Sequence, residues 1–177
     1  KYSEEIRTDK EYGCGLEDVL NGRKKDIMGI LNGIDYSIWN PTVDKLIPYR
    51  YTYQEVPLKY ENKRELLEKY KIEYDEEIPL IGVISRLVDQ KGFDLIEKII
   101  PQLMKEDVKL IILGIGEEKY HKFLKKIEKK YSSKLAVHIG FDEELAHHIE
   151  AASDMFLMPS KYEPCGLNQM YSLKYGT

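Results

Sequence analysis

The cations Arg86 and Lys91 follow closely after an apolar run over residues 78–84. That run is rich in β-branched residues and shows no polar alternation, which is typical of a strand buried on both faces. From Phe93 onwards, apolar residues recur at helical spacing. Arg86 is therefore expected at the carboxyl end of a buried strand, where ligands of open α/β sheets bind, and Lys91 near the first turn of the next helix.

A lysine at a helix N-terminus opposes the helix dipole, so two cations at this corner indicate that an anion completes the site. A phosphate ester is the first candidate. The same residues also have an ordinary structural interpretation, in which Arg86 pairs with Asp89 and Lys91 is a solvated surface residue.

Further apolar runs over residues 108–113, 135–139 and 155–158 alternate with segments of helical spacing. Asp142 is a plausible N-cap for one of these helices. Regular alternation of apolar strands with helices predicts an α/β fold, in which a parallel sheet carries helices on both faces.

The first part of the chain has a different character. Residues 1–26 are mostly helical in pattern, and residues 27–31 are predicted to form a short strand that ends in an Asn-Gly turn. Residues 36–60 show no periodicity and are rich in proline and aromatic residues, as in an ordered linker. We therefore divide the chain into an interdomain lead-in and linker, residues 1–60, and an α/β domain, residues 61–177.

Two other strand ends carry glycines. Gly114 and Gly116 resemble the start of a dinucleotide fingerprint, but the third glycine is absent and the pair follows the second strand, so a tight strand-to-helix turn is the better interpretation. Gly140 and Phe141 follow the third strand. Small residues at these ends let a ligand approach the backbone closely.

The segment Glu-Pro-Cys-Gly-Leu, residues 163–167, is more specific. Pro164 suits the start of a helix, and Gly166 leaves room for a ligand near backbone N–H groups that bind phosphate well. Glu163 would then face the ligand, although a carboxylate there also stabilises a helix N-terminus by about 0.3–1 kcal/mol. Cys165 is better explained as a packing residue than as a nucleophile. The adjacent His147 and His148 point in different directions on a helix, so we assign no metal site.

Composition excludes several classes of function. The chain has 177 residues and a formal charge of −4, which argues against general binding of nucleic acid through a basic surface. No apolar run reaches the length of a membrane span, and the charged first residues do not resemble a secretory signal. Two distant cysteines are consistent with a reducing, cytoplasmic setting. Because neither end looks like a natural terminus, we expect a fragment of a longer protein.

From about Tyr12 onwards, several ordered motifs resemble bacterial glycogen synthase and plant starch synthase. They are GILNGIDYSIWNPTVD, SRLVDQKGFDLI and the long segment that begins HIGFDEELAHHIE and ends at EPCGLNQMYSLKYGT. The resemblance implies the Rossmann-like C-terminal half of a retaining GT-B glycosyltransferase, truncated, which binds the donor nucleotide. Such enzymes transfer glucose from ADP-glucose to the non-reducing end of an α-1,4-glucan, without a cofactor or an essential metal, in the bacterial cytoplasm or the plastid stroma.

The resemblance also assigns residues. In the family, a strand-end arginine and a lysine five residues later contact the donor diphosphate, and the carboxylate of the EPCGL motif contacts the donor glucose. These catalytic positions match Arg86, Lys91 and Glu163. Positions that line the adenine pocket, the sugar or the phosphates match Gly140, Phe141, Asn32, Cys165, Gly166, Leu167 and Asn168. The last departs from the threonine or glycine that is frequent there.

The N-terminal domain of the family, with its lysine-glycine donor motif and acceptor surface, does not match any part of this sequence. We therefore expect the chain alone to be inactive. Two alternatives stay open at this stage. One is a GT-B transferase that uses another sugar nucleotide, since the sequence does not distinguish ADP-glucose from UDP-glucose. The other is a non-catalytic module that binds a nucleotide or a glucan.

Overall fold

The computed structural model describes the whole chain, residues 1–177. By internal contacts the chain forms two compact units: Lys1–Gly33 with Glu163–Gly166, and Ile34–Tyr162 with Leu167–Thr177. The domain boundary expected at residue 60 stays a prediction. None of the helices combines the length and the apolar character required to cross a membrane.

The first unit is helical. Its elements are α1 (Tyr2–Thr8), α2 (Lys10–Gly13) and α3 (Glu17–Gly22), which confirms the helical pattern. The strand predicted over residues 27–31 is wrong, because the segment is irregular and its apolar side chains Met28, Ile30 and Leu31 are exposed. A strand needs a hydrogen-bonded neighbour, and no strand of this chain pairs with these residues.

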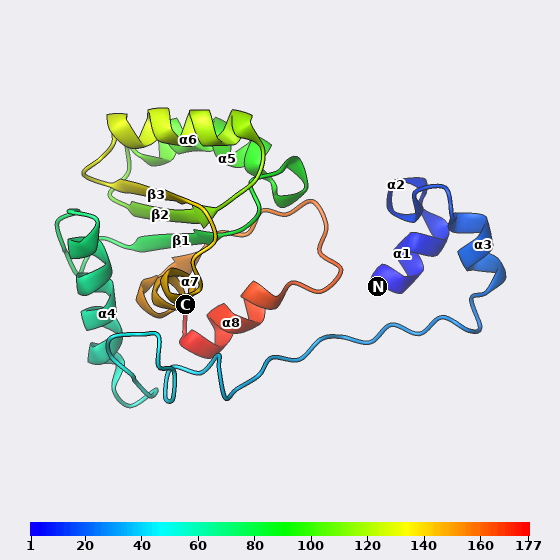
Figure 1. Cartoon of the computed structure of the whole chain (residues 1–177), viewed down its shortest axis with the longest axis horizontal. Coiled ribbons are helices and arrows are strands. Elements are labelled where there is room, and N and C mark those ends of the chain that lie inside the picture. Colours follow the sequence, from blue (N-terminus) through cyan, green and yellow to red (C-terminus); the bar gives the residue numbers. More distant parts are fainter. The chain divides into compact units, whose positions relative to one another are not determined.

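The second unit contains a parallel sheet of four strands, as predicted, and the order of the strands is β3-β2-β1-β4 (Figure 1). The strands are β1 (Leu80–Ile84), β2 (Lys109–Gly114), β3 (Leu135–Ile139) and β4 (Met155–Phe156). β4 is shorter than expected, since only Met155 and Phe156 pair with β1. Because all strands run the same way, their carboxyl ends meet at one edge of the sheet.

Helices cover both faces of this sheet, which also confirms the prediction (Figure 1). They are α4 (Val56–Lys69), α5 (Phe93–Leu103), α6 (Glu118–Lys130), α7 (Glu143–Ala152) and α8 (Leu167–Tyr175), with a short 3₁₀ turn, η1 (Asp89–Lys91). Ile112 of β2 packs in the core with α5 and α6, and its neighbour Ile111 packs with α4 and α7. Asp142 caps α7 as predicted, since its side chain accepts from the Leu145 N–H at 2.9 Å.

Aromatic side chains pack the irregular segment before α4 onto α7 and α8. Trp39 stacks on His147 at 3.7 Å and on Tyr171 at 3.8 Å between ring centroids. Asp44 accepts a hydrogen bond from the Tyr175 hydroxyl and pairs with His147 Nδ1 at 2.7 Å. His147 is thus part of a buried polar network of this unit.

Gly82 of β1 provides a test of the packing between β1 and α7. A Cβ atom at this position would meet the Ser153 hydroxyl and lie 2.8 Å from Ile149 Cγ2. We expect Gly82→Val to lower the free energy of unfolding by about 1–3 kcal/mol, because a packed core does not accommodate the added atoms. Urea unfolding followed by the fluorescence of Trp39 measures this change.

Gly22→Val is the matched control, since a Cβ atom there would have no neighbour within 4 Å. Equal unfolding midpoints for the two variants would contradict the packing described for Gly82.

Candidate functional site

Arg86 lies just beyond the carboxyl end of β1. Backbone hydrogen bonds between the segment that follows β1 and the segment that follows β2 continue past the ends of both strands. The Ser85 N–H donates to the Leu113 carbonyl of β2 at 3.1 Å. The Leu87 N–H donates to the Ile115 carbonyl at 2.9 Å, and the Leu87 carbonyl accepts from the Glu117 N–H at 2.9 Å. Both neighbours of Arg86 are therefore fixed, and the exposed Arg86 side chain leaves the edge of the sheet from a rigid backbone.

Gly114 and Gly116 make this pairing sterically feasible. A Cβ atom at Gly114 would meet the Ser85 carbonyl oxygen, and one at Gly116 would lie 2.7 Å from the Leu87 amide nitrogen. The two glycines therefore allow the connection that follows β1 and the connection that follows β2 to lie close together. This supports the tight-turn interpretation of the pair over a dinucleotide fingerprint.

The connection between β1 and α5, residues 85–92, is anchored to α6 by Asp89. Its carboxylate accepts from the Tyr120 hydroxyl and from Lys119 Nζ, the latter at 2.9 Å. The hydrogen bonds from Tyr120 and Lys119 hold the pKa of the Asp89 carboxyl below its usual range. Asp89 therefore pairs with α6 rather than with Arg86, unlike the ordinary interpretation of the sequence.

Arg86 and Lys91 lie on this same connection. Arg86 Nη2 donates to Gln90 Oε1 at 2.8 Å. Lys91 is half-buried and ends η1, two residues before α5 begins, with its N–H bonded to the Val88 carbonyl at 3.0 Å. The next residue, Gly92, has a positive φ of 75°, and a Cβ atom there would press on the Pro159 backbone. The connection is thereby held against the segment that follows β4.

Other predicted residues of the second unit reach the same edge of the sheet. Gly140 follows β3, and its N–H donates to the Gly114 carbonyl at 3.0 Å, while the next side chain, Phe141, is 88% exposed. Asn168 in the first turn of α8 donates from Nδ2 to the Ile84 carbonyl at 2.7 Å, which fixes the start of α8 to the end of β1. Leu167 opens that helix.

The remaining predicted residues belong to the first unit. The Asn32 N–H donates to Cys165 Sγ at 3.3 Å, across 133 residues of sequence, so Cys165 acts there as a hydrogen-bond acceptor. Glu163 is half-buried and Gly166 is buried. The roles of all these residues toward a ligand stay predictions.

Sequence reasoning missed the part played by Gln90. Nothing in the sequence marks its amide as a partner of Arg86, although its place in the motif SRLVDQKG was visible. No group of three or more His, Cys, Asp or Glu side chains is placed to hold a metal ion. His148 Nε2 instead lies 3.1 Å from the Asn62 carbonyl, and His121 Nε2 accepts from the Gly116 N–H at 3.1 Å.

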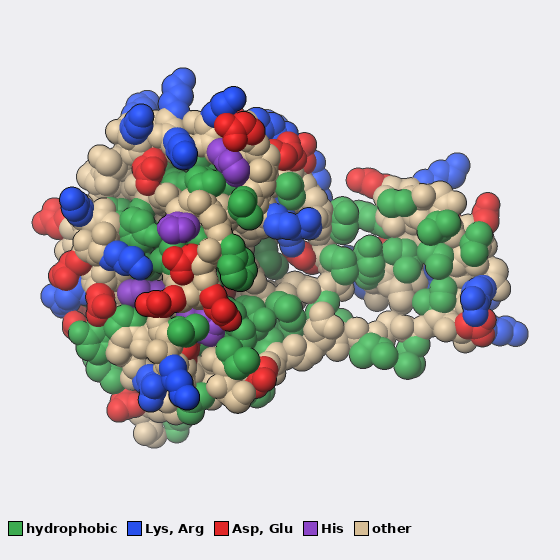
Figure 2. All heavy atoms as spheres, viewed as in Figure 1, with side chains coloured by type: hydrophobic (Ala, Val, Ile, Leu, Met, Phe, Trp, Pro, Cys, Tyr) green, Lys and Arg blue, Asp and Glu red, His purple; other side chains and the backbone are tan.

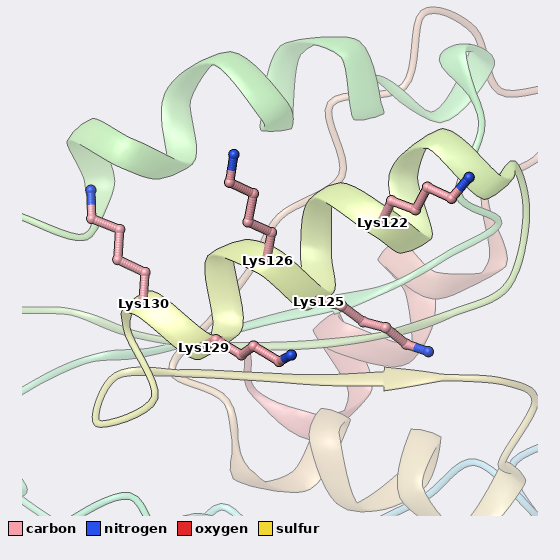
Figure 3. Close-up of a pocket in the computed structure, with 5 residues that line it drawn as sticks. All are labelled: Lys122, Lys125, Lys126, Lys129 and Lys130. Atoms are coloured by element: carbon pink, nitrogen blue, oxygen red, sulfur yellow. The ribbon is translucent and has the colours of Figure 1, made fainter.

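A basic surface lies apart from the carboxyl edge, on the outer side of α6, where cationic side chains gather (Figure 2). A shallow hollow there is lined by Lys122, Lys125, Lys126, Lys129 and Lys130. In Figure 3, Lys126 and Lys130 project from one side of α6, and Lys125 and Lys129 project from the other. These cations all come from one helix and diverge, whereas Arg86 and Lys91 share one short connection at the strand ends.

Residues 64–177 match the family model described as glycosyl transferases group 1. The chain belongs to this family. It is 52% identical over 176 residues to glycogen synthase of Pseudothermotoga lettingae. It is 50% identical over 176 residues to that of Thermosipho africanus. Each alignment covers 99% of this chain and 36% of the relative, so the chain spans about a third of the length of these relatives.

The structure of this chain is similar to the catalytic domain of starch synthase IV from Arabidopsis thaliana bound to ADP and acarbose. The TM-score is 0.93 at 37% identity, and the match covers 99% of this chain and 36% of that one. These comparisons confirm the resemblance to glycogen and starch synthases, and the fold of a C-terminal GT-B half.

Asp89 provides a pH test of the anchored connection. A carboxyl whose pKa is lowered in the folded state stabilises the fold above its unfolded pKa of about 3.9, and this stability is lost as the pH falls through the folded pKa. We therefore expect Asp89→Asn to be less stable than the parent chain at pH 7. The difference between the two should shrink as the pH falls below about 4.

Thermal unfolding between pH 7 and pH 2.5 measures this difference. Asp107→Asn is the control, because that carboxyl is 89% exposed and lies 3.5 Å from Lys134. A difference for Asp89→Asn that does not vary with pH would contradict the anchoring role.

Proposed function

We propose that this chain is the donor-binding part of a glucosyltransferase that builds glycogen or starch. In this proposal the whole enzyme transfers glucose from ADP-glucose to the non-reducing end of an α-1,4-glucan with retention, and no metal or cofactor takes part. The observation that carries the proposal is the placement of Arg86 and Lys91 on one anchored connection at the carboxyl end of β1. The names of the similar proteins support the choice of reaction.

Arg86 and Lys91 would bind the donor diphosphate and stabilise the charge that develops on it as the bond to glucose breaks. Cations that are already held in place stabilise such a charge without having to reorganise during the reaction. The planar guanidinium of Arg86 suits two phosphate oxygens at once, and the ammonium of Lys91 adds a compact second charge.

The other matched residues would bind the rest of the donor. Gly140 leaves the backbone at the end of β3 accessible, and the exposed ring of Phe141 offers an apolar surface to a base. Glu163 would contact the glucose, near Cys165, Gly166 and Leu167, and Asn32 would reach the sugar. The side-chain nitrogen of Asn168 already donates to the Ile84 carbonyl. We therefore assign Asn168 the role of positioning the start of α8 near the phosphates.

Titration with ADP tests the diphosphate site. We expect Arg86→Ala and Lys91→Ala each to weaken ADP binding by about 1.5–3 kcal/mol, because each removes a charge-assisted hydrogen bond. Isothermal calorimetry with ADP, UDP and ADP-glucose measures the affinities and compares the two bases. Tighter binding of UDP than of ADP would favour a transferase that uses another sugar nucleotide.

Lys98→Ala is the matched control, since Lys98 is exposed on α5. ADP affinity that is unchanged in both site variants would remove the assignment of the diphosphate site. Binding of a glucan without any nucleotide would favour a non-catalytic glucan-binding module.

A second test concerns turnover. We expect the 177-residue chain, supplied with ADP-glucose and glycogen, to transfer no glucose above background, because it spans only about a third of the length of the glycogen synthases that it matches. Incorporation of radiolabelled glucose into glycogen measures the rate, with full-length Pseudothermotoga lettingae glycogen synthase as the positive control. Sustained turnover by the chain would refute this expectation.

A further inference from the structure

Gln90 connects the proposed diphosphate site to the segment that follows β4. Its side-chain oxygen accepts from Arg86 Nη2 at 2.8 Å, and its side-chain nitrogen donates to the Tyr162 carbonyl at 3.2 Å. Its backbone carbonyl accepts from the Lys161 N–H at 2.9 Å. One half-buried residue thus joins the Arg86 guanidinium to backbone groups of two consecutive residues, Lys161 and Tyr162.

Glutamine is suited to this arrangement because its amide carries an acceptor and two donors on one planar group. A glutamate would accept from Arg86 but would have no donor for the Tyr162 carbonyl. It would also pair with the guanidinium and reduce the positive charge presented to a phosphate. The neutral amide therefore orients Arg86 while preserving its charge.

We propose that Gln90 is the positioning residue that orients the Arg86 guanidinium for the donor diphosphate. This inference rests on the proposed function. Only one of the five guanidinium N–H groups is used by Gln90, so the others can point at phosphate oxygens. Restraint of a long side chain before binding lowers the entropy cost of ordering it when the ligand arrives.

Gln90 also forms hydrogen bonds with Lys161 and Tyr162, the two residues just before Glu163 in the sequence. The Gln90 side chain is therefore bonded to both Arg86 and the Tyr162 carbonyl, while its backbone carbonyl accepts from the Lys161 N–H.

The test compares Gln90→Met, which keeps the side-chain length without either polar group, with Gln90→Glu. Gln102→Met on the exposed side of α5 is the matched control. ADP affinity is measured by NMR titration, which extends to millimolar dissociation constants. We expect Gln90→Met to weaken ADP binding about three- to tenfold, as for the loss of a hydrogen bond, and Gln90→Glu to weaken it at least as much.

A second readout separates positioning from a general structural effect. The ¹⁵N heteronuclear NOE of the Arg86 Nε–H group reports how ordered the guanidinium is in the absence of ADP. We expect this NOE to fall in Gln90→Met while the backbone NOE values of residues 85–92 and the unfolding midpoint stay as in the Gln102→Met control. If Gln90→Met does not fold, Gln90→Glu provides the affinity measurement.

Wild-type ADP affinity in both Gln90 variants, or an unchanged Arg86 NOE in Gln90→Met, would overturn the inference. A fall in affinity that accompanies disordered backbone over residues 85–92 would overturn it too, because Gln90 would then only maintain the fold. If Arg86→Ala and Lys91→Ala both leave ADP affinity unchanged, the proposed function fails instead, which this set of variants distinguishes.

Discussion

The structure of the candidate site depends on the pairing between the chain segments that continue β1 and β2. Leu87 is fully buried and hydrogen-bonded through both its amide and its carbonyl after β1 has formally ended. This pairing requires glycine at Gly114 and Gly116, because side chains there would collide with the opposite backbone. Arg86 is consequently fixed at the point where the sheet stops and solvent begins.

Burial of the sheet explains why the polar groups gather at its edge. β1 and β2 contribute to two separate apolar cores, one on each face, so the strands leave little room for charged side chains. The parallel arrangement then brings the ends of β1, β2 and β3 to one side. Asp89, Gln90 and Asn168 add side-chain hydrogen bonds that fix the connections in place.

Much of the second unit was predictable because it depends on local periodicity. The four strands, their parallel direction, the helices on both faces and the Asp142 cap all follow from patterns that a sequence displays directly. The error at residues 27–31 arose because an apolar run does not reveal whether a partner strand exists. Likewise, the bonds from Asp89 to α6, from Gln90 to Tyr162 and from Asn32 to Cys165 join distant segments, and composition gives no sign of them.

We propose that the carboxyl end of β1 holds a nucleotide diphosphate. Mapping of ADP-induced shifts in the backbone amide NMR spectrum of the whole chain tests it most directly. We predict that the largest shifts fall on residues 85–92, 140–141 and 166–168. Shifts confined to the lysine-lined surface of α6, or none at millimolar ADP, would show that the carboxyl end of β1 does not bind the diphosphate.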